Sequence, residues 1–232
     1  MKLIKVKNYN ELSEKAFQIV KKEISKKPNL VIGFATGKTT LGLYRKLAEA
    51  YRKGEIDFSK IKSFNLDEYY PIKKKNKKSL SYSMFKNLFN KINIKKENIN
   101  LLNGNAKDIK KECKNYENKI RKNPIDIQIL GVGINGHIGF NEPGSEFDSK
   151  TRLVYLSKET IKRKNVTKKA LTVGISTIMK SKKIILLAFG KKKAKAVRDL
   201  IKGEINKNCP ASFLKKHKNL FVIIDGKAGS LL

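Results

Sequence analysis

Residues 124–130 read PIDIQIL, and residues 131–144 continue as GVGINGHIGFNEPG. The first part is a short apolar run, rich in β-branched residues and preceded by a proline, which predicts a buried strand. The second part contains five glycines, and glycine permits tight turns and a close approach of the backbone to a ligand. We therefore expect a rigid, exposed loop directly after a strand.

This glycine-rich loop carries His137, one of the two histidines in the chain, with Glu142 five residues later. In open parallel sheets, ligands bind at the carboxyl ends of the strands, which is where His137 would lie. A lone histidine in a turn is explained by capping of a neighbouring element. The accompanying carboxylate, two asparagines and the glycines instead favour a functional site.

On both sides of this stretch, short apolar runs alternate with segments of helical periodicity. Further strands are expected over residues 3–7, 29–35, 61–66, 151–156, 184–189 and 220–225, and a further unit starts at residues 170–174. No internal repeat, low-complexity linker or composition break divides residues 1–232. The pattern predicts a single α/β domain with a mostly parallel central sheet.

Composition narrows the classes of protein that are compatible with the chain. Lys and Arg number 53 against 20 acidic residues, a formal charge of +33, but the lysines are spread over the whole length. Because no zinc pattern or aromatic RNA-binding signature accompanies them, nucleic-acid binding is kept only as an alternative. Cys113 and Cys209 match no metal spacing. Without an apolar stretch of membrane-spanning length or a signal peptide, a soluble, cytoplasmic protein is expected.

Four loops follow predicted strands, at residues 36–40, 67–71, 131–142 and 190–193. The carboxyl ends of parallel strands lie at one edge of a sheet, so these loops should converge on one site. In the first loop, Gly37, Lys38 and Thr39 precede a helix but lack the nucleotide-binding spacing, because position 32 is Ile and Gly33 is one residue too close. Backbone N–H groups, hydroxyls and a lysine at a helix start still suit a phosphate group. A helix cap by Thr36 or Thr39 is compatible with that role.

The second loop begins with Asp67 and Glu68, and one of these carboxylates is expected to point into the cleft. A carboxylate beside a phosphate site can remove a proton from a carbon next to a carbonyl or imine, although Asp67 alone would be explained as a turn cap. His137 with Glu142 offers a second acid–base pair. Two proton-handling groups and a phosphate anchor indicate sugar-phosphate isomerisation.

The residues described so far, with several other segments, resemble one known family. The matching segments are residues 33–37 with Thr39, 64–69, 98–105, 131–143, 170–174 and 210–212. The chain resembles the glucosamine-6-phosphate deaminases nearly from end to end, and residues 136–143, GHIGFNEP, are highly specific to them. The resemblance implies conversion of glucosamine 6-phosphate and water to fructose 6-phosphate and ammonia, in amino-sugar catabolism. It also implies a Rossmann-like three-layer fold, with no metal or organic cofactor.

The resemblance also implies roles for individual residues. His137 matches the base that opens the pyranose ring, supported by Glu142 and Asn135, and Asp67 matches the base that moves a proton between C2 and C1. Some members have Asp where this chain has Asn135. Because its amide is neutral, Asn135 cannot be a charged partner for His137. The residues expected to hold the phosphate are Thr36, Gly37, Lys38, Thr39 and Lys193.

Departures from the family pattern affect phosphate binding and regulation. Members often carry an NSRFF stretch with a phosphate-binding arginine, where this chain has only residues 161–169. Arg163 is the candidate replacement, and the alternative is weaker substrate affinity. Regulated members bind N-acetylglucosamine 6-phosphate between subunits; Arg152 matches them, but Val154 replaces a lysine and the chain stops at Leu232, before their longer tail. Little or no activation is expected.

The expected partner is therefore a small sugar phosphate, with no specific nucleic acid and no membrane; a homo-oligomer is left open. The alternative enzyme is a phosphogluconolactonase-like relative on the same fold, which would not need Asp67 for proton transfer at C2. The alternative from another class is a basic nucleic-acid-binding protein.

Overall fold

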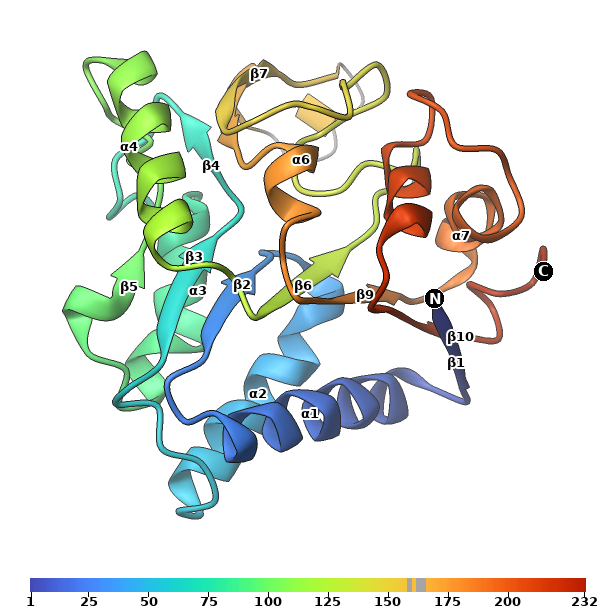
Figure 1. The fold of residues 1–232 in the computed structure, drawn as a ribbon, viewed down its shortest axis with the longest axis horizontal. Coiled ribbons are helices and arrows are strands. Elements are labelled where there is room, and N and C mark those ends of the chain that lie inside the picture. The colour runs from blue at the N-terminus through green and yellow to red at the C-terminus, as the bar shows by residue number, and fades with distance from the viewer. Residues whose placement is uncertain (158–159, 162–165) are drawn as a thin grey trace.

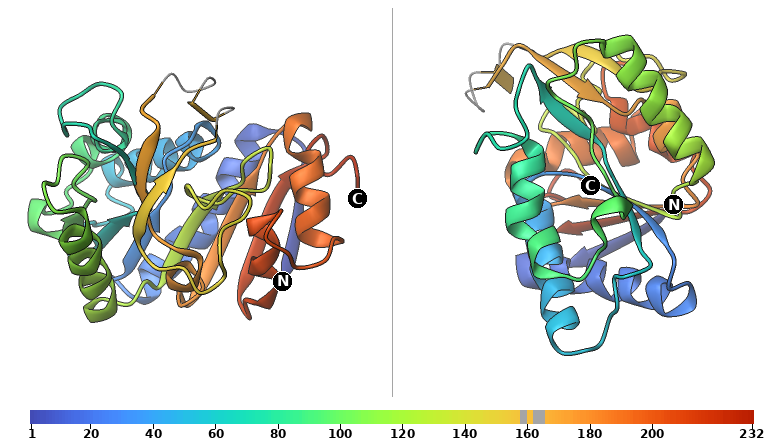
Figure 2. Two further views of the ribbon diagram at one scale, coloured as in Figure 1. Left: turned by 90° about the horizontal axis from the view of Figure 1, so that it is seen from above. Right: turned by 90° about the vertical axis from the view of Figure 1, so that its left-hand side faces the viewer.

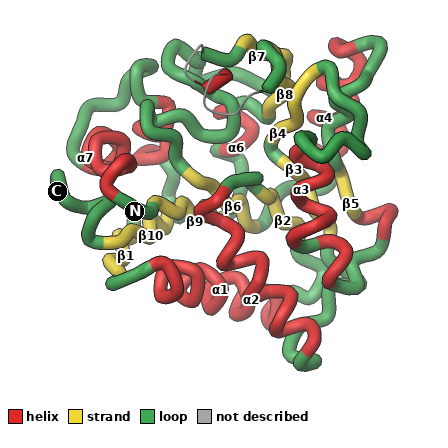
Figure 3. Tube along the Cα trace, turned by 180° about the vertical axis from the view of Figure 1, so that it is seen from behind, coloured by secondary structure: helices red, strands yellow, loops and turns green. Residues whose placement is uncertain are grey.

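The computed structural model describes residues 1–157, 160–161 and 166–232 of the chain. Within these ranges, a seven-stranded parallel sheet forms the centre of the molecule (Figure 1). Its strand order is β1 (Lys2–Val6), β10 (Leu220–Asp225), β9 (Lys183–Ala188), β6 (Ile127–Gly131), β2 (Val31–Phe34), β3 (Lys62–Asn65) and β5 (Ile99–Asn100). Figure 3 shows the row of strands from behind. The expectation of a mostly parallel sheet is confirmed.

Helices cover both faces of this sheet, which gives three layers (Figures 1 and 2). One face carries α1 (Tyr9–Lys26), α2 (Leu41–Arg52) and α3 (Leu80–Asn87). The other carries α4 (Ile109–Lys122), α6 (Ile175–Ile178) and α7 (Ala194–Ile201). Short 3-10 turns are η1 (Lys38–Thr40), η2 (Phe89–Lys91), η3 (Lys96–Asn98), η4 (Lys191–Lys193) and η5 (Pro210–Lys216). None of these described helices is long and apolar enough to cross a bilayer.

The apolar strands explain why the sheet is buried on both faces. In β9, Ile184 and Leu186 pack into the cluster under α4 and α7, while Ile185 and Leu187 pack against α1 and α2. All four side chains are fully buried. A parallel strand covered on both faces needs a continuous apolar run rather than an alternating one, as the sequence of residues 184–189 predicts.

A second, three-stranded antiparallel sheet lies beside the carboxyl ends of β2 and β3. It consists of β4 (Asp67–Tyr70), β8 (Lys169–Thr172) and β7 (Arg152–Tyr155), in that order. The backbone N–H of Leu66 donates to Phe34 O (3.0 Å), and the N–H of Val173 donates to Leu66 O (2.7 Å). These bonds fix the small sheet to the edge where the site was expected.

The small sheet corrects two expectations. Residues 67–71 do not form a loop, because residues 67–70 pair with β8 and the Tyr69 ring packs on Phe140, with 5.4 Å between the ring centroids. Residues 152–155 form a strand as expected, but in the small sheet rather than the parallel one. Tertiary pairing decided these elements, and the local pattern does not contain that information.

Candidate active site

A cavity of about 910 Å³ lies at the carboxyl edge of the large sheet. All four segments that were expected to converge contribute to its wall. They are residues 35–41 after β2, Asp67 and Tyr69 of β4, residues 131–140 after β6 in part, and residues 189–193 after β9. The convergence predicted from parallel strands is therefore present, with β4 taking the place of the expected second loop.

The loop after β2 is held by the side chain of Thr40, at the end of η1. Thr40 Oγ1 donates to Ala35 O (3.1 Å) or Gly37 O (3.0 Å), and η1 leads directly into α2. Thr36, Gly37, Lys38 and Thr39 all line the cavity. The buried hydroxyl of Thr36 has no hydrogen-bond partner among the described residues. A hydroxyl and helix-start N–H groups around an open space suit an anion such as phosphate.

The turn after β9 also contributes to the wall of the large cavity. Gly190 adopts φ 88°, a conformation that favours glycine, and its N–H donates to Asp225 Oδ1 (2.8 Å). This bond fixes the turn that presents Lys193, which also lines the cavity. Both predicted parts of the phosphate site are thus placed on one cavity.

The wall of the cavity is strongly positive. Among the residues that the structure describes, its cations are Lys38, Arg45, Lys191, Lys192 and Lys193, and its one lining carboxylate is that of Asp67. A cleft lined by one sign of charge attracts an oppositely charged ligand. The balance suits a phosphate ester with a single acidic group nearby for proton transfer.

His137 is positioned by the glycine-rich loop, as its sequence predicts. A Cβ on Gly133 would lie 2.3 Å from the His137 ring, so only glycine lets the ring pack against this backbone. The N–H of Gly133 donates to His137 O (2.8 Å). At Gly136, φ is 81° and a Cβ would meet Cys209 Sγ at 2.6 Å. The ring orientation therefore depends on two glycines of the loop.

The hydrogen bonds of Asn135 determine the tautomer of His137. Asn135 Oδ1 accepts the backbone N–H of His137 (3.3 Å) and lies 2.6 Å from His137 Nδ1. An amide oxygen can only accept, so Nδ1 must carry the proton. In the neutral imidazole, Nε2 then carries the lone pair and is the atom that can act as a base. Asn135 itself is not part of the cavity wall.

The adjacent carboxylates Asp67 and Glu68 have different environments. Glu68 is buried and accepts hydrogen bonds from Tyr69 N (2.9 Å), Leu80 N (2.8 Å), and the N–H and hydroxyl of Ser81 (2.8 and 2.6 Å). It thereby ties β4 to the start of α3, where the helix dipole favours a negative charge. Asp67 lines the cavity. The expectation that one of the two carboxylates faces the cleft is met by Asp67.

Asp67 lies close to the histidine loop. It pairs with Thr172 of β8, and the Thr172 hydroxyl accepts the N–H of Phe140 (3.1 Å). A Cβ on Gly139 would lie 3.6 Å from Asp67 Oδ2. Gly139 has φ 58°, so a glycine both makes the turn and leaves room beside the carboxylate.

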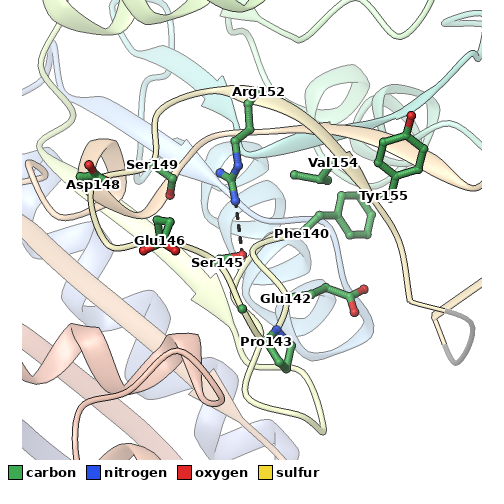
Figure 4. A pocket seen from close by; sticks show the side chains of 11 residues that line it. Phe140, Glu142, Pro143, Ser145, Glu146, Asp148, Ser149, Arg152, Val154 and Tyr155 are labelled. Atoms are coloured by element: carbon green, nitrogen blue, oxygen red, sulfur yellow. Dashed lines mark hydrogen bonds between the residues drawn. The ribbon is translucent and has the colours of Figure 1, made fainter.

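Glu142 is not among the residues that line the large cavity. It lines a smaller cavity of about 520 Å³, formed by residues 140–155 in part (Figure 4), and Phe140 lines both cavities. Glu142 Oε1 is buried without a hydrogen-bond partner among residues within the described ranges. The predicted pairing of Glu142 with His137 remains a proposal.

The smaller cavity also contains Arg152 and Val154, the two positions that bear on regulation (Figure 4). The guanidinium of Arg152 donates to Asn141 Oδ1 (2.9 Å) and to Ser145 Oγ (3.3 Å). Burial lowers the pKa of this guanidinium. Within the described part of the chain, the carboxylates on the same wall are Glu142, Glu146, which pairs with Lys207 (2.6 Å), and Asp148, against one lining cation. This charge balance disfavours a phosphorylated effector.

Not every site residue could be placed or predicted. Arg163, the candidate replacement for the phosphate-binding arginine, lies outside the described residues. Arg45 also lines the cavity but was not predicted from the sequence. Its position one turn after Leu41, at the start of α2, is the feature that could have indicated it. Sequence reasoning also missed Tyr9 and Phe189, for which no local pattern indicated a role.

The two cysteines are buried, consistent with packing roles. Burial raises the pKa of the Cys113 thiol to about 11, and it also raises the pKa of Cys209. Thiols with raised pKa values are poor nucleophiles at neutral pH. Neither cysteine lines the large cavity.

Known proteins are similar in sequence to this chain over its whole length. A family model described as glucosamine-6-phosphate isomerases/6-phosphogluconolactonase matches residues 6–222. Two relatives named glucosamine-6-phosphate deaminase, from Thermoanaerobacter sp. (strain X514) and Clostridium novyi (strain NT), are each 51% identical over 241 residues. The alignments cover all of this chain, and 95% and 100% of the respective relatives.

Solved structures give the same grouping. A monomeric glucosamine-6-phosphate deaminase superposes with a TM-score of 0.97 at 41% identity, and the match covers 100% of both chains. A 6-phosphogluconolactonase from Thermotoga maritima superposes with a TM-score of 0.79 at 24% identity, covering 97% of this chain and 98% of that one. At that identity, the second match concerns the fold alone.

Proposed function

The chain belongs to the family of glucosamine-6-phosphate isomerases and 6-phosphogluconolactonases. We propose that it has the first of these two activities and that the residues of the large cavity perform it. The chain is an enzyme that isomerises and deaminates glucosamine 6-phosphate, giving fructose 6-phosphate and ammonia. Relatives at 51% identity and a structure at 41% identity carry that activity in their names. The lactonase relative is more distant, at 24%.

The observation that carries the mechanism is that Asp67, His137 and the phosphate-binding loops line one cavity. The phosphate binds to residues 36–39 and to Lys193, which leaves the sugar carbons facing the two proton-handling groups. His137 Nε2 takes the proton of the C1 hydroxyl and returns one to the ring oxygen, which opens the ring. The proton on Nδ1 and its contact with Asn135 hold the imidazole in the tautomer that this step requires.

Asp67 then moves a proton between carbons. Its carboxylate takes the proton from C2, next to the C1 carbonyl, and delivers it to C1. The amine at C2 becomes an imine, water adds to the imine carbon, and ammonia leaves. Lactone hydrolysis would not need a base at C2, so the place of Asp67 on the cavity wall favours the deaminase. Glu142 assists His137 when the substrate is bound.

The proposal extends to partners and location. We propose that a single copy of the chain is active. The structural relative is described as monomeric. We place the enzyme in the cytoplasm, where sugar phosphates are metabolised. Sedimentation velocity at assay concentration tests the expectation of an active monomer.

The decisive experiment measures ammonia and fructose 6-phosphate formed from glucosamine 6-phosphate, with 6-phosphogluconolactone hydrolysis assayed in parallel. Equal amounts of the two products, with negligible lactone hydrolysis, are expected. Lactone hydrolysis without ammonia release would overturn the proposal in favour of the lactonase. If the protein binds heparin at low salt and is released at moderate salt, the net charge of +33 supports only nonspecific electrostatic binding.

A further inference from the structure

Tyr9, the first residue of α1, connects to the phosphate loop although it is distant in sequence. Its hydroxyl donates to Lys38 O (2.8 Å) and accepts the N–H of Gly42 (2.8 Å). One hydroxyl therefore bridges the two ends of the segment 38–42, in which η1 passes into α2. The N–H of Gly42 belongs to the first turn of α2, where N–H groups have no acceptor within the helix.

The ring of Tyr9 reaches the second half of the phosphate site. It packs edge-on against Phe189, with 5.2 Å between the centroids and 62° between the planes. Phe189 comes immediately before Gly190 and the lysines of η4. Tyr9 and Phe189 both line the cavity together with Lys38 and Lys193. Tyr9 thus contacts both of the loops that hold the phosphate.

Tyr9 is itself held in place by the start of α1. Asn8 caps the helix by accepting the N–H of Glu11 (3.0 Å), and the Ser13 hydroxyl donates to Tyr9 O (2.8 Å). A Cβ on Gly42 would lie 2.0 Å from Ser13 Oγ and 3.1 Å from the Tyr9 ring. Glycine at position 42 therefore allows α1 and α2 to approach closely enough for the bridge to form.

We propose that Tyr9 is a positioning residue that sets the spacing between the loop of residues 36–40 and the lysine turn 190–193, and so determines affinity for the phosphate group. This inference rests on the proposed function, which makes these loops the phosphate site. Tyr9 carries no charge and takes no part in proton transfer. Its removal therefore weakens binding and leaves the chemical steps intact.

The test compares Tyr9→Phe, which keeps the ring and loses the hydroxyl, with Tyr9→Leu, which loses both contacts. For Tyr9→Phe we expect KM for glucosamine 6-phosphate to rise about threefold to tenfold, as for the loss of one hydrogen bond. We expect kcat to stay within twofold. Calorimetry with fructose 6-phosphate in ammonia-free buffer should show the same rise in Kd. Tyr9→Leu should raise both values further.

Tyr70→Phe is the matched control, because the Tyr70 hydroxyl also donates to a backbone carbonyl, Ala106 O (3.2 Å), but away from the cavity. It should leave KM and Kd within twofold. Unchanged KM and Kd in Tyr9→Phe, or a fall in kcat alone, would overturn the inference. Turnover by the wild type decides the proposed function separately, and the calorimetric Kd decides the role of Tyr9 even if turnover fails.

Discussion

The two histidines of the chain lie at opposite ends of the parallel strands and serve opposite purposes. At the carboxyl end, His137 Nδ1 donates to Asn135, and its ring faces the large cavity. At the amino end, His217 is buried, its Nε2 lies 2.7 Å from Ser181 O, and its Nδ1 accepts the N–H of Asn219 (3.2 Å). The partners require opposite tautomers, because a carbonyl can only accept and an N–H can only donate.

Two buried aspartates show the same contrast. At the amino end, Asp126 bonds Lys27 (2.6 Å), Lys182 (3.0 Å) and the N–H of Val31 (2.9 Å). At the carboxyl end, Asp67 lines the cavity beside the histidine loop. Asp126 is bonded by two lysines and a backbone N–H, whereas Asp67 lines space for a ligand. For these two aspartates, the position relative to the strands distinguishes a structural carboxylate from a candidate functional one.

The largest effect should come from Asp67→Asn. An amide cannot accept the C2 proton, so kcat should fall about 10²-fold to 10⁴-fold, the range that general acid–base catalysis contributes. The thermal midpoint should change by only a few degrees, because the amide has nearly the same shape. Steady-state kinetics and a thermal melt on the same preparation measure both. Turnover equal to that of the wild type would remove Asp67 from the mechanism.

The histidine pair tests the contrast directly. His137→Gln should lower kcat about 10²-fold or more with little loss of stability, because the side chain lies in a loop beside the cavity. His217→Gln should leave kcat within twofold and lower the free energy of unfolding by about 1–3 kcal/mol, because it disturbs two buried backbone bonds. Urea unfolding and turnover of both variants provide the measurements. The reverse pattern would contradict the division between the two ends.

Asp126 should contribute stability that depends on pH. Burial alone would raise its pKa, but the bonds from Lys27, the N–H of Val31 and Lys182 outweigh burial and lower the pKa from its usual value of 3.8. The unfolded chain therefore binds this proton more readily, so the contribution is present above about pH 4 and is lost below it. Both lysines are largely exposed, so Asp126→Asn should cost only about 1 kcal/mol at pH 7.

Urea unfolding at several pH values checks the Asp126 prediction. The difference between wild type and Asp126→Asn should be constant from pH 7 to pH 5 and should shrink as the pH falls below 4. A difference that stays constant down to pH 3 would show that the ionised carboxylate is not what stabilises the fold.

The smallest effect is expected for N-acetylglucosamine 6-phosphate. Arg152 is already bonded by Asn141 and Ser145, and Val154 adds no charge to a wall with more carboxylates than cations. The rate curve for glucosamine 6-phosphate should therefore be hyperbolic, with the same KM with and without this compound. A sigmoidal curve that becomes hyperbolic on its addition would contradict the prediction.

Much of the fold could be predicted because its strands are local apolar runs with clear ends. Residues 220–225 and 184–189 indicated the strands at or near their observed bounds, and a sheet covered on both faces requires such runs. The β4 strand could not be predicted, since Asp67–Tyr70 is polar at its start and becomes a strand only by pairing with β8. Pairing of that kind depends on residues about a hundred positions away.

Some residues of the candidate site could likewise be predicted from the sequence, and others could not. Thr36 and His137 belong to turns whose glycines and spacing are visible in the sequence, so their convergence followed from strand order alone. Tyr9 could not be found, because its role depends on the contact of α1 with the start of α2. Glu142 lines the smaller cavity and not the large one, and its pairing with His137 stays a prediction. Side-chain direction after a turn is not encoded in spacing.

The pairing of β1 with β10 has a consequence for synthesis of the chain on the ribosome. Residues 2–6 pair with Leu220–Asp225, which emerge roughly 220 residues later. At ~5–20 residues per second, the first strand waits about 10 to 40 seconds for its neighbour. Throughout that interval it can associate with other nascent chains, and Lys2, Lys5 and Lys7 act as gatekeepers, because like charges repel a second copy.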